Sequence, residues 1–149
     1  MSRELKFSVH SLAFLTSLLL VSGCSSFNYD WNHAAATPPP LFGISGRWQG
    51  TWRSEVTGHT DQLRCIITRV DMDDYEARFK AKYHGILSFS YTVPLKVVQK
   101  EDGFRFSGAA DLGAMAGGMY QYEGHAEPTN FFSTYSSKDD HGTFQMGRP

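Results

Sequence analysis

The sequence has little cysteine, no excess of charge of either sign, and no apolar run long enough to cross a bilayer as a helix. Its two cysteines, Cys24 and Cys65, exclude a small domain held together by a disulfide framework. Fourteen Lys and Arg against 15 Asp and Glu leave no basic field for nucleic acid. The longest uncharged apolar run, residues 11–21, falls short of the about 20 residues that a membrane span needs.

Motifs of catalysis and metal binding are also scarce. There is no HExxH, no CxxC and no GxSxG, and the closest pair of metal-ligand type is His59 with Asp61 in "HTD". The glycine-rich stretch 113–118, "GAMAGG", leads into a strand-like run rather than a helix N-terminus, so it does not fit a phosphate loop. We therefore expect no nucleic-acid partner, no metal, no cofactor and no enzymatic activity.

The N-terminus carries a targeting pattern. Arg3 and Lys6 precede the apolar run, as in a secretory signal peptide, and the run ends in "VSGC", residues 21–24. This tetrapeptide resembles the lipobox of bacterial lipoproteins: an aliphatic residue, two small residues and a cysteine. The resemblance implies a signal peptide over 1–23, cleavage after Gly23, and an acylated Cys24 carrying a diacylglycerol thioether and usually a third, palmitate-like chain.

The lipobox resemblance also predicts a location. Two acyl chains already anchor a protein stably, so a lipidated Cys24 implies membrane attachment at the bacterial cell envelope. Ser25, rather than an aspartate, follows the cysteine, which in the enterobacterial sorting pattern favours the outer membrane over the inner. No feature identifies a protein partner. A lipidated Cys24 excludes a disulfide, and Cys65 in the apolar run "LRCIITRV" is then expected to be a buried thiol.

Residues 24–43 are expected to be a lipidated cysteine followed by a flexible tether. The stretch mixes polar, alanine and proline residues without periodicity, and Pro38 to Pro40 favour polyproline II over packed structure.

Residues 44–149 show the period-two pattern of an all-β domain. The clearest strand is "YEARFKAKY", in which one face carries Tyr75, Ala77, Phe79, Ala81 and Tyr83 and the other Glu76, Arg78, Lys80 and Lys82. We expect the first face to be buried and the basic row of the second face to be solvated. The eight strands predicted in this way are 46–54, 62–71, 75–83, 87–100, 104–112, 119–126, 130–136 and 143–148.

The connections between these strands are short, and Asp102-Gly103 is a strong hairpin signal. Eight short antiparallel strands joined in this way are best closed as an up-and-down β-barrel, because closure removes the exposed sheet edges. The alternative is a β-sandwich.

The two ends of this domain resemble the calycins, the superfamily of lipocalins, fatty-acid-binding proteins and avidins. Gly46-Arg47-Trp48 opens the first strand and Arg148 ends the last, as in the Gly-x-Trp and closing arginine of those barrels. The resemblance implies that Gly46, Trp48 and Arg148 close one end of a barrel. The lipocalin Thr-Asp-Tyr motif is absent and no C-terminal helix follows.

Aromatic residues supply the candidate binding site. An eight-stranded barrel is just wide enough to be filled by its own side chains or to hold one small ligand. Trp52 lies four residues after Trp48 on the first strand, so both side chains are expected on the same face of the sheet. The inward candidates for ligand binding are Trp52, Phe104, Phe106, Tyr120 and Tyr122. We expect a non-enzymatic barrel that binds a small apolar or amphipathic ligand. The alternative is a filled barrel that acts as a protein-interaction or structural module of the envelope.

Overall fold

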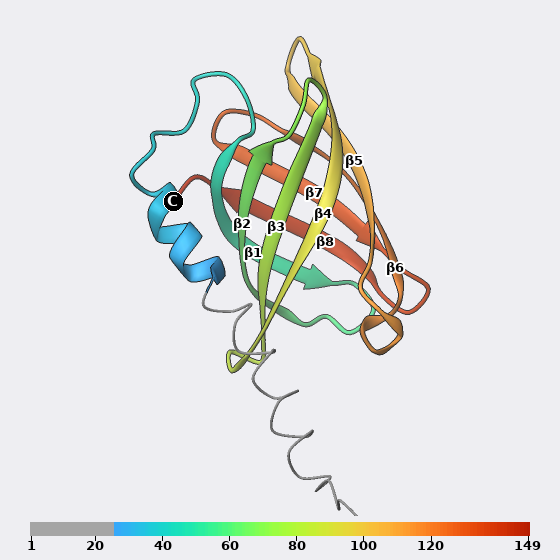
Figure 1. Cartoon of the computed structure of the whole chain (residues 1–149). Helices are drawn as coiled ribbons and strands as arrows, with labels where there is room; N and C mark the ends of the chain where they lie inside the picture. Colours follow the sequence, from blue (N-terminus) through green and yellow to red (C-terminus); the bar gives the residue numbers. More distant parts are fainter. Residues whose placement is uncertain (1–25) are drawn as a thin grey trace, which may run out of the picture.

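The structure is a computed structural model that describes residues 26–149; the expected signal peptide and Cys24 lie outside the described residues (Figure 1). Eight strands form one sheet. Their bounds are β1 Gly46–Ser54, β2 Thr60–Arg69, β3 Asp74–Tyr83, β4 Leu87–Lys100, β5 Gly103–Asp111, β6 Met119–Ala126, β7 Asn130–Ser136 and β8 His141–Gly147, with a short 3₁₀ helix η1, Ala114–Ala116, between β5 and β6. Among residues 26–149 no helix has the length and apolar character needed to cross a membrane.

The sheet closes on itself. Each strand pairs with the next in antiparallel fashion, and β1 pairs with β8 in a register that sets Trp52 opposite Phe144. The predicted eight-stranded up-and-down barrel is confirmed, the sandwich alternative is wrong, and the strand ends lie within two residues of those expected. Gly50 is required at the β1–β8 seam, because a Cβ there would collide with the carbonyl oxygen of Gln145.

The expected burial of the inner face of β3 is confirmed for its first three residues, but Ala81 is only half-buried and Tyr83 is 39% exposed. Tyr75, Ala77 and Phe79 are buried and belong to a core that extends along the inside of the barrel from Trp48 to Phe144. Every strand contributes to this core, because alternate residues of each one point inward.

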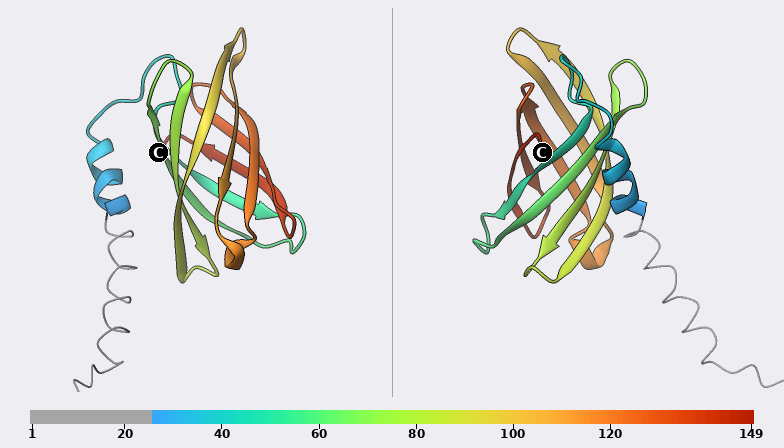
Figure 2. Two further views of the ribbon diagram at one scale, coloured as in Figure 1. Left: turned by 45° about the vertical axis from the view of Figure 1, so that its right-hand side comes forward. Right: turned by 90° about the vertical axis from the view of Figure 1, so that its left-hand side faces the viewer.

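The outer face of β3 differs from the expectation, and so does the segment before the barrel. Residues 26–34 form a helix, where an unpacked tether was expected, and the helix lies against the outside of the wall (Figure 2). Its Phe27 and Trp31 are buried against Ile66 of β2. The basic row is therefore not fully solvated: Lys80 is only 8% exposed, and its Nζ lies 3.2 Å from Asn28 Oδ1 of the helix.

The two ends of the barrel differ in the residues and connections that they contain, and we call them the closed end and the open end. The closed end holds Trp48 and Arg148, together with the connections 70–73, 101–102 and 127–129. The open end holds the connections 55–59, 84–86, 112–118 and 137–140. Trp48 and Trp52 both lie on the inner side of β1 and point to these two ends.

Candidate functional site

Trp48 and Arg148 form the centre of the closed end. Trp48 is completely buried and donates a hydrogen bond from Nε1 to the carbonyl of Ile44 (2.8 Å). The guanidinium carbon of Arg148 lies 3.8 Å from the centroid of the indole, in cation–π contact. Burial lowers the pKa of Arg148 to about 10, well above neutral pH, so the guanidinium stays charged on the ring.

Arg148 also ties the end together through the backbone. It donates hydrogen bonds to the carbonyls of Ser45, Arg47, Gly43 and Pro128. One side chain thus joins the start of β1, the segment before it and the β6–β7 connection.

Gly46 makes room for this arrangement. Its φ of +104° suits glycine, and a Cβ there would lie 3.0 Å from Nη1 of Arg148. The structure therefore brings Gly46, Trp48 and Arg148 together.

The remaining space at the closed end is filled by stacked rings. Phe106 stacks on Phe131 at a centroid distance of 4.7 Å, and Phe131 contacts Trp48 at 5.5 Å. Phe104 lies two residues before Phe106, near the start of β5, and is partly buried against the same core. Phe104 and Phe106 share the inward parity expected of them but lie at the filled end, so the structure does not bring them together with the other ligand-binding candidates.

The open end holds a cavity of about 580 Å³ inside the barrel. Aromatic residues make up nearly half of its lining and include three of the candidates, Trp52, Tyr120 and Tyr122. The remaining lining residues are Ala81, Lys82, Tyr83, Phe89, Ser90, Tyr91, Thr92, Asp111, Leu112, Met115, Ala116, Tyr135, Asp140 and Phe144. Sequence reasoning missed Tyr91, Tyr135 and Phe144, although strand parity alone would have placed all three on the inner face.

Hydroxyl groups are grouped in pairs on the aromatic wall. Tyr91 and Tyr122 lie close enough for each side chain to affect the pKa of the other. On the opposite side, Tyr135 donates to Asp140 Oδ2 (3.0 Å), and Ser54 donates to Asp140 Oδ1 (2.6 Å). The cavity therefore combines ring faces with a few fixed polar atoms, which is the usual make-up of small-molecule sites.

The phenols of this wall stay neutral at physiological pH. Burial, the largest cause in each case, raises the pKa of Tyr91, Tyr122 and Tyr135 above the usual value for tyrosine, and for Tyr135 the neighbouring carboxylate of Asp140 adds to the increase. The Tyr135 hydroxyl already donates its proton to Asp140, so toward a ligand it can act only as an acceptor.

Trp52 forms part of an aromatic rim at the mouth of the cavity. It donates a hydrogen bond from Nε1 to the carbonyl of Lys82 (2.8 Å) and lies parallel to Tyr83 at a centroid distance of 6.2 Å. His59 packs against both rings. Asp61 accepts a hydrogen bond from the backbone N–H of Gly85 (2.8 Å), which ties the β3–β4 hairpin to β2; this bond is the main reason that the pKa of Asp61 is lowered.

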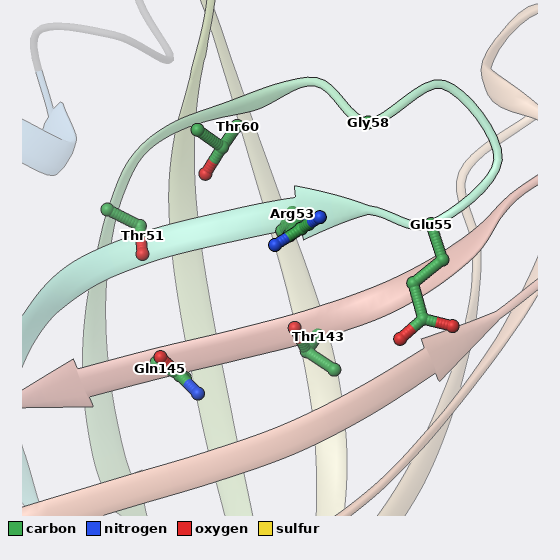
Figure 3. A pocket seen from close by; sticks show the side chains of 7 residues that line it. All are labelled: Thr51, Arg53, Glu55, Gly58, Thr60, Thr143 and Gln145. Atoms are coloured by element: carbon green, nitrogen blue, oxygen red, sulfur yellow. The ribbon is translucent and has the colours of Figure 1, made fainter.

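A second hollow, of about 870 Å³, lies on the outside of the barrel over β1 and β8 (Figure 3). Thr51, Arg53, Thr143 and Gln145 point into it from the outer faces of these strands, with Glu55 at one end. It is an open groove with polar walls and no large apolar side chain, so it does not suit an apolar ligand.

The candidates for a reactive thiolate or a metal site are Cys65 and the acidic and histidine side chains. Cys65 is a free, fully buried thiol, and burial raises its pKa well above the usual value, which disfavours the thiolate. Over residues 26–149 there is no group of three or more His, Cys, Asp or Glu side chains placed to hold a metal ion.

Comparison of the chain with models of known protein families, with curated proteins and with solved structures gives no match. The resemblance to calycins therefore depends on the residues at the two ends of the domain, and the site has to be interpreted from its own chemistry.

Proposed function

We propose that this protein is a lipid-anchored barrel of the bacterial envelope that binds a small amphipathic molecule at its open end and catalyses no reaction on it. The observation that carries the proposal is the aromatic-walled cavity of about 580 Å³, a volume within the range of about 300–1,000 Å³ typical of small-ligand sites.

The walls define the kind of molecule that fits. The ring faces of Trp52, Tyr122 and Phe144 suit an apolar body, either an acyl chain or a flat ring system. Asp140 offers an acceptor to a hydroxyl or amino group inside the cavity, and Lys82 places a cation at the mouth. An apolar body with one or two polar groups satisfies both features, whereas a wholly polar solute leaves the rings without a partner.

The location is carried by the lipobox pattern "VSGC". An acylated Cys24 would attach the barrel to a membrane, where amphipathic molecules concentrate, and Ser25 favours the outer membrane. The alternative, a filled barrel that docks a protein, is less well supported because the open end of this barrel holds a pocket of about 580 Å³.

Native mass spectrometry of the protein extracted from its own membranes tests the proposal. Ala81 lies on the cavity wall, so Ala81→Phe would fill the cavity; Ala109, on the outer face of β5, provides the matched variant Ala109→Phe. The native protein and Ala109→Phe should carry a bound small molecule that Ala81→Phe loses. If none of the three proteins carries an additional mass, or if all carry the same one, the cavity is not the binding site.

A further inference from the structure

Exposed apolar side chains gather at the open end of the barrel. Ile86 at the tip of the β3–β4 hairpin is 87% exposed, and Met115 in η1 is fully exposed. Leu87, Phe89 and Met119, on the strands beside these two tips, are also more than half exposed. Such a group can mark a surface that contacts another apolar phase; exposed apolar side chains also occur at the closed end, at Val70 and Met72, so the choice between the two ends depends on the N-terminal helix.

The two apolar tips stand forward of the charged part of the rim. In Figure 1 the β3–β4 hairpin and the η1 loop reach furthest at the lower end, and the β7–β8 connection, with Lys138 and Asp139, stands back from them. A flat apolar surface brought to this end would meet the tips first and leave the charged connection in water.

The N-terminal helix fixes the direction in which the chain leaves the barrel. Its first turn lies beside the open half of β3, where Asn28 accepts a hydrogen bond from Lys80. Its later part lies beside the start of β1, where Arg47 stacks on Trp31 at 5.1 Å. The helix therefore runs from the open end toward the closed end, and it begins on the side of the open end (Figure 1).

The helix is held firmly enough to set an orientation. Phe27 is 1% exposed, and Arg64 and Arg78 lie over its ring at 5.6 and 5.9 Å. Arg78 also forms an ion pair with Asp30 (2.6 Å). Apolar burial, cation–π contact and an ion pair act on one short helix, so the helix and the wall form one unit.

Cys24 is separated from Ser26 by one residue, so their Cα atoms are at most about 7.6 Å apart. A lipid on Cys24 must then enter the bilayer close to the start of the helix, on the side of the barrel to which the open end points.

We propose that the open end faces the bilayer, with Ile86 and Met115 inserted at the lipid interface, so that the cavity takes up its amphipathic molecule directly from the membrane. This inference rests on the lipid anchor and on the ligand cavity proposed above. It makes Trp52 and Tyr83 the residues that an entering molecule meets first.

Site-directed fluorescence in vesicles tests the orientation. The full lipidated chain is reconstituted into phosphatidylethanolamine–phosphatidylglycerol vesicles with a thiol-reactive fluorophore at Ile86→Cys or Met115→Cys. The controls are Val70→Cys and Met72→Cys, which are also exposed apolar positions but lie at the closed end. All four side chains are exposed, so the variants should fold, and the buried Cys65 thiol should not react.

Lipids that carry a nitroxide on the acyl chain should quench the labels at 86 and 115 severalfold more strongly than those at 70 and 72. Equal quenching at the two ends, or stronger quenching at 70 and 72, would overturn the orientation. A second variant, Phe27→Ala with Trp31→Ala, should release the helix from the wall, so that all four labels are quenched to a similar degree. If the labels at 86 and 115 are still quenched more strongly in this variant, the helix does not set the orientation of the barrel.

Two further measurements separate this inference from the proposed function. If Cys24→Ser still floats with the vesicles, the anchor is elsewhere and the inference fails with it. If the native chain floats and carries its ligand but the four labels are quenched alike, the proposed function stands and only the membrane-facing orientation falls.

Discussion

Trp48 and Trp52 lie four residues apart on the same side of β1, yet their surroundings have little in common. Trp48 is fully buried under Arg148 and stacked rings, whereas Trp52 is partly buried at the mouth of a cavity. The same barrel is thus closed by packed rings at one end and has a pocket at its mouth at the other.

The difference arises from the inward side chains that lie at the same height along the barrel axis. At the closed end, Phe106 and Phe131 face Trp48 and occupy the interior. At the open end, the inward positions include Ala81 and Ala110, whose small side chains leave space between the aromatic walls. Aromatic content alone does not decide whether such a barrel binds a ligand, because both ends carry aromatic side chains.

The largest expected effect is at the closed end. Trp48→Ala should lower the free energy of unfolding by about 3–5 kcal/mol, because it removes a fully buried ring and leaves a cavity. Trp52→Ala is the matched variant at the hollow end and should cost clearly less in the same urea titration. Equal costs would mean that the two ends do not differ in packing.

Alkaline pH should act through the open end. The folded-state pKa values of Tyr91, Tyr122 and Tyr135 are raised, so above about pH 10 these phenols ionise in the unfolded chain first. Stability should begin to fall above about pH 8, where the Cys65 thiol ionises first in the unfolded chain. It should fall more steeply above about pH 10, by about 1.4 kcal/mol per pH unit for each further group, here the tyrosines, that is protonated only in the barrel.

Urea titrations across this pH range, with Tyr122→Phe as the test variant, would measure the alkaline loss. The loss should be shallower in Tyr122→Phe than in Tyr29→Phe, a change at an exposed tyrosine of the N-terminal helix. A slope unaffected by either change would argue against buried phenols at the open end.

A smaller effect concerns the contact between Trp48 and Arg148. A double-mutant cycle of Trp48→Ala and Arg148→Ala should give a coupling energy of about 0.5–2 kcal/mol, since the cation–π contact can be lost only once. The pair Trp52 and Arg148, which point to opposite ends, should be additive to within about 0.5 kcal/mol. Additivity between positions 48 and 148 would remove the closing role assigned to the arginine.

Periodicity predicted the barrel well, because residues that alternate between core and solvent leave a period-two pattern in every strand. It did not tell the two ends apart. Phe106 and Tyr122 have the same inward parity, and only the pairing register places one at the filled end and the other on the cavity wall.

The N-terminal helix could not be predicted from local pattern. Residues 26–34 are too few to form a stable helix alone, and the signal was limited to Phe27 and Trp31 at i, i+4 spacing. What stabilises the helix is the basic outer face of β2 and β3, where Arg64 and Arg78 lie over its rings. That contact joins positions more than 30 residues apart, which a sequence window does not show.

The smallest effect on stability and the most informative effect on function are expected at Trp52. Trp52→Phe keeps a ring at the mouth and loses only the hydrogen bond to the carbonyl of Lys82. Because one such hydrogen bond contributes little net stability, the melting temperature should change little. The affinity for a fluorescent fatty acid should fall about fivefold, equivalent to about 1 kcal/mol of lost contact.

The most direct test of the account is therefore a titration of the full chain with this fatty acid, comparing the native protein with Trp52→Phe and with Trp31→Phe, which alters a tryptophan outside the barrel. The account predicts that the native protein and Trp31→Phe bind the probe alike and that Trp52→Phe binds it more weakly. Equal affinity in all three proteins, or no binding by the native protein, would contradict the claim that the open end of this barrel is a ligand site.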